Sequence, residues 1–347
     1  MSWLRRNLFG SWLDGGVTLL LGGLLLWLLA GFLRWALIDA VFVDPTGDTC
    51  RAAQQSGGGA CWAVVLEKGR FILFGTYPYE LQWRAGYAVL TIAVTLFAFT
   101  RRFLWGAPLA LVGAAGALLS VGLMHGFGIL APVPAEMWGG LPLTLLLALG
   151  GLVLAFPLAI LLALARTGAL PVLRWLATFF IELVRGVPLI SVLFMAAVMV
   201  PLLLPPGVSL DKLLRALLGF ALFAAAYLAE VIRGGLQAVP ASQREAATAL
   251  GLGYWQAARL VVLPQALRHV IPPLFNTAIG FFKDTSLVII IGLFDLLATA
   301  KAALADPQWR FAYREIYLLA ALVYFLFCFG AARHGRHLDR LLNRRQA

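Results

Sequence analysis

Two short segments of the chain repeat one arrangement of opposite charges beside long apolar runs. They are Glu182-x-x-Arg185 and Glu230-x-x-Arg233. Residues three apart are neighbours on a helix surface, so each pair can close within its own helix. On adjacent antiparallel helices the pairs could instead cross, Glu182 with Arg233 and Glu230 with Arg185. Charges near an apolar layer are costly unless they are paired. We therefore interpret the four residues as a structural clamp or a cytoplasmic gate, with direct contact to a solute as the alternative.

A third charged group, Lys283-Asp284-Thr285-Ser286, falls near the middle of an apolar run. An ammonium and a carboxylate side by side are chemically suited to the two charges of a zwitterion such as an amino acid. The alternative is a polar clamp between helices, which is favoured because adjacent residues point in different directions on a helix. The four residues are thus candidates for a solute path, and Asp295 is expected at the outer interface.

Chemistry of other kinds has no visible basis in the sequence. There is no G-x-x-x-x-G-K-[ST] segment for nucleotide phosphates, no H-E-x-x-H and no G-x-S-x-G. The chain has 4 histidines, and His334 and His337 in the basic tail lack further ligands, so no metal site is predicted. We expect neither catalysis nor a bound cofactor.

The composition then defines the setting of these residues. Of 347 residues, 62% are hydrophobic and 12% are charged, whereas a soluble domain has about a quarter of its residues charged. This excludes a soluble enzyme, a disordered protein and a secreted disulfide scaffold. The net charge of +11 does not indicate nucleic-acid binding, because the basic residues lie between apolar runs, where orientation and anionic lipid explain them. The fold class is an all-α polytopic membrane protein.

Eight apolar runs predict about eight transmembrane helices. They lie near residues 17–38, 86–100, 106–124, 140–165, 174–204, 213–236, 269–294 and 315–332. The fifth is too long for one straight crossing and contains Pro188, which predicts a kinked helix with a cytoplasmic extension. Lys and Arg are more frequent on the side of the N-terminus, so both termini are expected in the cytoplasm. No cleavage site follows the first run, which predicts an uncleaved first helix.

The runs divide the chain near residue 138. Residues 1–138 are expected to form an N-terminal extension of three helices with an outer loop at 39–85. Residues 139–335 form a five-helix unit with a cytoplasmic loop at 237–268, and 336–347 form a basic tail. Cys50 and Cys61 share the outer loop, where they could form a disulfide in an oxidising compartment or remain unpaired.

The residue pattern of the expected cytoplasmic loop predicts a short helical hairpin. Ser242 and Glu245 have the spacing of a capping box that would begin the first helix, and Gly251 stands where a left-handed C-terminal cap is expected. Tyr254 begins a second helix that Pro264 would end. Such short helices are not stable alone in water, so the hairpin must pack against another surface.

The same loop resembles the EAA loop of permease subunits in binding-protein-dependent ABC importers. The matching positions are Glu245, Ala246, Ala247, Gly251, Val261, Leu263 and Pro264. The flanking segments 233–240, 263–268 and 283–287 look like those of the polar amino-acid branch. The resemblance covers about residues 140–335. The three additional helices and the long outer loop resemble the longer permeases of the general L-amino-acid transporter group.

This resemblance implies a type I ABC importer core in a bacterial inner membrane. Its partners would be a second permease, two ATP-binding subunits that hold ATP and Mg²⁺, and a periplasmic amino-acid-binding protein. The loop would contain the coupling helix that sits on the ATPase, with Glu245, Ala246, Ala247, Gly251, Leu263 and Pro264 as coupling residues and Ser242 as its cap. The alternatives are an ion-coupled secondary carrier, which would lack such a loop, and a membrane enzyme.

Overall fold

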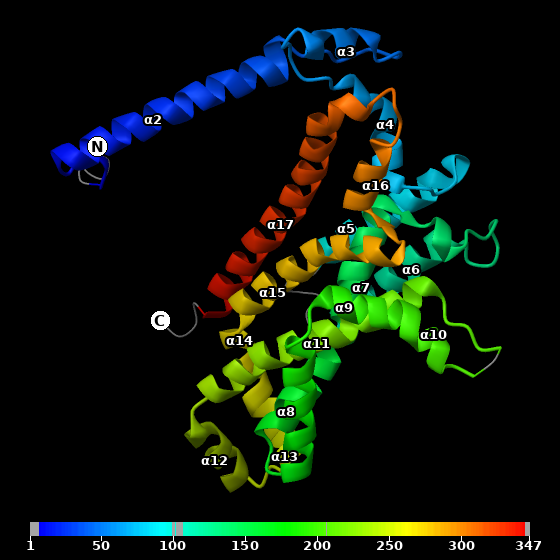
Figure 1. Ribbon diagram of the computed structural model, residues 1–347. Helices are drawn as coiled ribbons and strands as arrows, with labels where there is room; N and C mark the ends of the chain where they lie inside the picture. The colour runs from blue at the N-terminus through cyan, green and yellow to red at the C-terminus, as the bar shows by residue number, and fades with distance from the viewer. Residues whose placement is uncertain (1–6, 99–100, 102–106, 206, 344–347) are drawn as a thin grey trace. The chain divides into compact units, whose positions relative to one another are not determined.

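The computed structural model describes residues 7–98, 101, 107–205 and 207–343. Within these residues the regular structure is helical, except for the two-residue strand β1 (Phe294–Asp295). The ends of the expected spans 86–100 and 106–124, the first six residues of the extension 1–138 and the last four residues of the tail 336–347 lie outside the described residues. Figure 1 shows the order of the helices along the chain.

Six helical segments among the described residues are long and apolar enough to cross a membrane, and a bent pair makes a seventh candidate. The six are Trp12–Ile38 (α2 and η1), Tyr79–Ala98 (η2 and α5), Gly140–Thr167 (α7), Lys212–Ala238 (α11), Ile271–Ile291 (α15 and η7) and Arg310–Leu342 (η8 and α17). The all-α membrane fold is confirmed at this level. Helix α6 (Ala107–His125) contributes only a shorter apolar stretch, Leu111–His125, and a crossing needs about 20 apolar residues.

The kink predicted at Pro188 in the fifth span is present, and it is sharp enough to break the helix in two. Helix α8 (Pro171–Arg185) and the segment Leu189–Leu203, which comprises α9, η5 and α10, meet at an angle of 101°. Gly186 ends α8, and Pro188 takes an extended conformation at the start of α9. A proline lacks the N–H that would continue the helical ladder, which explains why the chain turns here.

By packing, the described chain forms two compact units. The first comprises Met1–Arg70 and Lys301–Leu319, and the second comprises Phe71–Ala300 and Ala320–Ala347. In the first unit, the region expected as a loop contains α3 (Asp48–Gln55) and the start of α4 (Ala63–Phe74). A disulfide joins Cys50 to Cys61, and the backbone N–H of Cys61 donates to Glu315 at 2.8 Å.

The core of the second unit lies between α7 and α11, the pair of elements with the most extensive contact. Small residues allow this close approach. A Cβ atom on Gly151 would lie 2.7 Å from Cδ1 of the fully buried Phe220, and one on Gly150 would lie 3.2 Å from Leu217. The glycine pair in this helix therefore serves close helix packing.

The seventh expected span changes its helical form part-way. Helix α15 (Ile271–Asp284) gives way to the 3₁₀ segment η7 (Thr285–Ile291), which ends at Gly292 with a φ of +73°. In strand β1, Phe294 then pairs with Gly139 and Asp295 pairs with Gly140, both in parallel β-bridges. Asp295 is fully buried, accepting from the N–H of Ala298 at 2.9 Å and from the hydroxyl of Tyr324 at 2.8 Å. This carboxylate caps the next helix, α16 (Leu296–Ala303).

Candidate functional site

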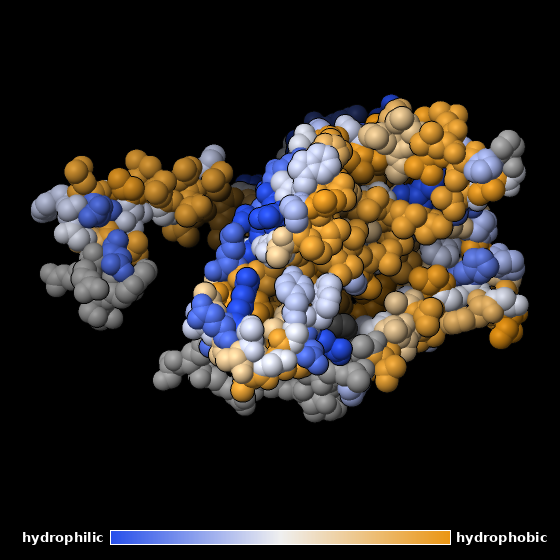
Figure 2. Space-filling view, turned by 90° about the horizontal axis from the view of Figure 1, so that it is seen from below, coloured by the Kyte–Doolittle hydropathy of each residue, from blue (hydrophilic) through white to orange (hydrophobic). Residues whose placement is uncertain are grey.

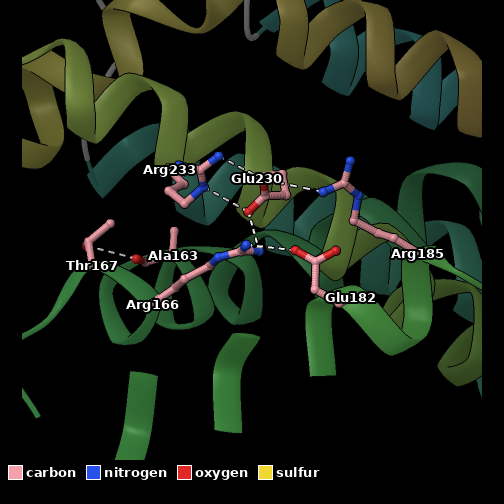
Figure 3. Close-up of polar contacts among 7 residues, drawn as sticks. All are labelled: Ala163, Arg166, Thr167, Glu182, Arg185, Glu230 and Arg233. Carbon is pink, nitrogen blue, oxygen red and sulfur yellow. Dashed lines mark hydrogen bonds and ion pairs between the residues drawn. The ribbon is translucent and has the colours of Figure 1, made fainter. Parts of the chain in front are cut away.

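A network of five charged side chains joins three helices of the second unit. Figure 3 shows Arg166, from the last turn of α7, between the two carboxylates, Glu182 of α8 and Glu230 of α11. Its guanidinium donates to Glu182 and to Glu230, each at 2.7 Å. Glu230 also accepts from Arg233 at 2.9 and 3.0 Å and pairs with Arg185 at 3.3 Å. Three arginines thus converge on one carboxylate.

The predicted pairing was correct in part. The crosswise pair of Glu230 with Arg185 and the pair of Glu230 with Arg233 within one helix are both present. No ion pair in the described part of the chain joins Glu182 to Arg185 or to Arg233, because Glu182 is taken by Arg166. The sequence analysis missed Arg166. The available signal was a basic residue in the last turn of a helix, where it also compensates the helix dipole.

The two carboxylates of this network differ in how much of their side chains is exposed. The side chain of Glu230 is 15% exposed and that of Glu182 is 57% exposed. A partly buried carboxylate with several arginine partners is held firmly, whereas an exposed pair contributes about 0–1 kcal/mol. Arg185 also lies 5.4 Å from the ring centre of Tyr227. Glu230 is therefore the centre of the arrangement, and it ties the ends of α7, α8 and α11 together.

Residues 237–268 contain a hairpin of short helices, as predicted, but the ends of these helices differ from the prediction. Helix α12 spans Ala241–Ala249 with Pro240 at its N-cap position, and no side chain caps it. The capping box of Ser242 and Glu245 was wrong. Proline at the N-cap position starts the helix two residues earlier than predicted, so Ser242 lies inside the first turn. The N–H of Gln243 donates instead to the carbonyl of Pro240 at 3.1 Å.

The turn at Gly251 follows the prediction. Gly251 has a φ of +77°, its N–H donates to the carbonyl of Thr248, and the N–H of Leu252 donates to the carbonyl of Ala247. This pair of bonds is a Schellman motif, in which glycine takes the left-handed position because it has no Cβ atom.

The second helix does not end at Pro264. Helix α13 (Tyr254–Ala257) passes into the π-helical turn η6 (Ala258–Val262) and then into α14 (Leu263–His269), with Pro264 in the first turn of α14. A π-turn widens the helix by one residue per turn, which accommodates a ring that would otherwise clash with the preceding turn. The expectation of a stop at Pro264 was therefore wrong.

The hairpin is fastened to the rest of its unit and presents apolar side chains. Gln265 donates to the side chain of Gln243 at 3.2 Å, and Arg244 donates to the carbonyl of Leu236 at 3.2 Å. Ala246 is exposed, but Ala247 is only 2% exposed and faces its own chain. Sequence reasoning missed three exposed apolar residues that flank the turn, namely Leu250, Tyr254 and Trp255.

The four residues of the candidate solute path lie at the change from α15 to η7. Lys283 is exposed, Asp284 and Ser286 are partly buried, and Thr285 is fully buried, donating to the carbonyl of Phe282 at 2.8 Å. Lys283 and Asp284 form no ion pair with each other or with another described residue. This cluster and the five-residue network lie on separate segments, and no hydrogen bond or ion pair among the described residues joins them.

Comparison with known proteins shows the family to which the chain belongs. Residues 155–344 match the family model described as "Binding-protein-dependent transport system inner membrane component". The chain belongs to this family. It is similar to the inner membrane amino-acid ABC transporter permease protein YhdY of Escherichia coli K12, with 45% identity over 99% of this chain and 93% of the relative.

Two further comparisons differ in how much of the chain they cover. The glutamate/glutamine/aspartate/asparagine transport system permease protein BztC of Rhodobacter capsulatus is 37% identical over 99% of this chain and 94% of its own. A crystal structure of an amino acid ABC transporter with histidines has 28% identity and a TM-score of 0.51, covering 58% of this chain and 91% of that chain. The long relatives thus share the N-terminal region, whereas the solved structure matches little more than half of the chain.

Proposed function

We propose that this chain is the membrane permease subunit of an ABC importer for L-amino acids of the polar or general class. The observation that carries the proposal is similarity over almost the whole chain to two long amino-acid permeases. As a permease it is not the ATPase, and ATP and Mg²⁺ are held by partner subunits rather than by this chain. A binding protein delivers the amino acid, and a second permease completes the pore.

In this proposal α12 is the coupling helix that docks on the ATPase. Glu245 and Ala246 are exposed on it, and Leu250 and Trp255 extend the exposed surface across the turn at Gly251. Leu263 and Pro264 belong to the helix that follows, and Ala247 packs inward to hold α12 in place. Movement of the ATPase is transmitted only if this element moves as a body, and the Schellman turn and the Gln243–Gln265 hydrogen bond support that stiffness.

The network around Glu230 would act as a clamp at the cytoplasmic end of the pore. Three helices meet there, and one of them, α11, leads directly into the coupling hairpin. Lys283 and Asp284 remain the candidates for contact with the ammonium and carboxylate groups of the amino acid. The change from α-helix to 3₁₀ helix beside them supports this role, because such a change within a span often marks a functional hinge.

For the topology we propose eight crossings with both termini in the cytoplasm, α6 and the bent α8–α9 segment each crossing once. The permease domain would be residues 139–335, preceded by the extension 1–138 and followed by the tail 336–347. The family match to residues 155–344 supports the core. The disulfide of Cys50 and Cys61 supports an external position for its loop, since disulfides persist in oxidising compartments.

Reconstitution into proteoliposomes tests the proposal against the ion-coupled carrier. The permease, its partner permease, the ATPase subunits and the binding protein should together import amino acids only when ATP is supplied on the ATPase side. A panel of amino acids would then define the substrate class. Uptake by the permease alone, driven by an ion gradient, would favour the carrier instead.

A further inference from the structure

A basic cavity opens beside the charged network. It has a volume of about 630 Å³ and lies among the ends of α7, α8 and α11 and the start of α12. Every charged residue in its lining is an arginine, and hydroxyl groups lie among them; the residues that matter here are Arg166, Arg174, Arg233, Arg244, Thr167 and Thr178. Neither Glu182 nor Glu230 belongs to the lining, so the cavity presents positive charge only.

Of the four arginines, two are fixed by bonds to a carboxylate and two have no carboxylate partner among the described residues. Arg166 and Arg233 are fixed by their bonds to Glu230. Arg174 is exposed and has no ion pair or side-chain hydrogen bond to any other residue that the structure describes. Arg244 donates to one carbonyl, that of Leu236, and forms no ion pair with a described residue. The fixed pair is preorganised, and the guanidinium groups of the available pair have unused donors.

From this geometry we propose that the cavity binds a phosphate group. Guanidinium groups match phosphate oxygens with paired donors, and hydroxyl groups such as those of Thr167 and Thr178 can complete the coordination. The three arginines and two carboxylates of the network leave one positive charge uncompensated, to which Arg174 and Arg244 add two. An anionic guest would balance this charge where α12 joins the membrane helices.

The surroundings favour a phospholipid headgroup as the source of that phosphate. Arg174 lies on α8, whose neighbouring residues Trp175, Leu176 and Phe179 are exposed, with the rings of Trp175 and Phe179 stacked at 5.7 Å. Tryptophan favours the membrane interface, and basic pockets between membrane helices on the cytoplasmic side bind anionic headgroups. In Figure 2 hydrophobic residues cover much of the visible face, and hydrophilic residues lie mostly towards its edges.

This inference rests on the proposed orientation, with α12 on the cytoplasmic side. Its test uses the assembled transporter in nanodiscs of phosphatidylcholine with increasing phosphatidylglycerol. Lipids retained after mild release are counted by native mass spectrometry. We expect phosphatidylglycerol to be retained selectively, and Arg174→Gln to weaken its retention about fivefold, the effect of one basic residue near an anionic membrane surface. Arg174→Gln together with Arg244→Gln should weaken it further.

Arg259→Gln is the matched control, because Arg259 is exposed on η6 and outside the cavity. It should leave retention unchanged. A second arm adds inorganic phosphate. If millimolar phosphate displaces the lipid and itself binds in an Arg174-dependent manner, the site takes free phosphate and the lipid source is wrong.

Equal loss of lipid in the Arg174 and Arg259 variants, or no selective retention, would overturn the proposal. So would a crosslink showing that an acidic residue of the ATPase fills the cavity in the assembled complex. ATP-dependent uptake is measured in the same preparations. Failure of lipid binding with uptake intact would refute this inference alone, whereas absence of ATP-dependent uptake would count against the proposed function.

Discussion

The guanidinium group of Arg166 in α7 donates a hydrogen bond to the carboxylate of Glu230 in α11 at 2.7 Å, and the two residues are 64 positions apart in the chain. The same guanidinium reaches Glu182 in α8. The side chain of Arg166 therefore links α7, α8 and α11. Helix α11 is the one that precedes α12 in the chain. A change in the spacing of these helices must break or rearrange this contact, which suits it to a gate.

Removing the central carboxylate should destabilise the protein. Glu230→Gln leaves Arg166, Arg185 and Arg233 without their shared partner, and we expect a loss of about 1–3 kcal/mol in stability, the usual cost when one partner of a buried polar contact is removed. The measurement is the thermal unfolding midpoint of the purified transporter. Glu182→Gln is the control and should cost about 0–1 kcal/mol, because Glu182 is mostly exposed. Equal losses in the two variants would contradict the central role of Glu230.

A side chain at the hairpin turn should weaken coupling to the ATPase. In Gly251→Val the strain is purely conformational, because the φ is +77° and no atom lies within 4 Å of the added Cβ. A β-branched residue is disfavoured there by at least about 1–2 kcal/mol. We expect less ATPase in pull-downs and lower substrate-stimulated hydrolysis. Gly253→Val, at a φ of −66°, should retain both, and normal docking by Gly251→Val would contradict the proposed role of the turn.

Close packing of α7 on α11 can be tested with two adjacent glycines. Gly151→Ala places a methyl group 2.7 Å from the ring of Phe220, which is fully buried and cannot move aside freely. Overpacking of this kind costs about 1–3 kcal/mol. Gly150→Ala meets only the flexible end of Leu217 at 3.2 Å and should be milder. Thermal midpoints of the two variants give the comparison, and a reversed order would show that the interface yields at Phe220.

The first unit should loosen at acidic pH. The backbone N–H groups of Cys50 and Gly47 donate to Asp44, and the Cys50 bond is the largest cause that lowers the pKa of this carboxyl group. Because the folded-state pKa lies below the unfolded value, the stabilisation is present above the unfolded pKa and is lost as pH falls through the folded pKa. Hydrogen exchange at residues 44–50 should therefore accelerate in that range.

Asp44→Asn is the control for this titration. Its segment should exchange faster than wild type at neutral pH, with less additional change on acidification. Acidification has the same effect at Asp306 as at Asp44, because a hydrogen bond from Lys68 lowers the pKa of Asp306. Exchange must therefore be read at residues 44–50 specifically. An unchanged acid response in Asp44→Asn would assign the effect to another group.

Local patterns predicted the helices and the hairpin turn because their causes lie within a few residues. The hydrophobic runs and the requirement for glycine at position 251 are of this kind. The role of Arg166 could not be predicted, since it depends on how three helices meet. Ser242 and Pro264 misled for a related reason: Pro240 offered an earlier helix start, and a π-turn absorbed the second proline.

The hydrogen bond from Cys61 to Glu315 joins residues separated by 254 positions, within a unit built from Met1–Arg70 and Lys301–Leu319. During synthesis the early segment emerges long before its counterpart exists. The N–H of Cys61 therefore lacks this partner until Glu315 has been synthesised. A product truncated before Glu315 would therefore leave one of this unit's two segments missing or incomplete.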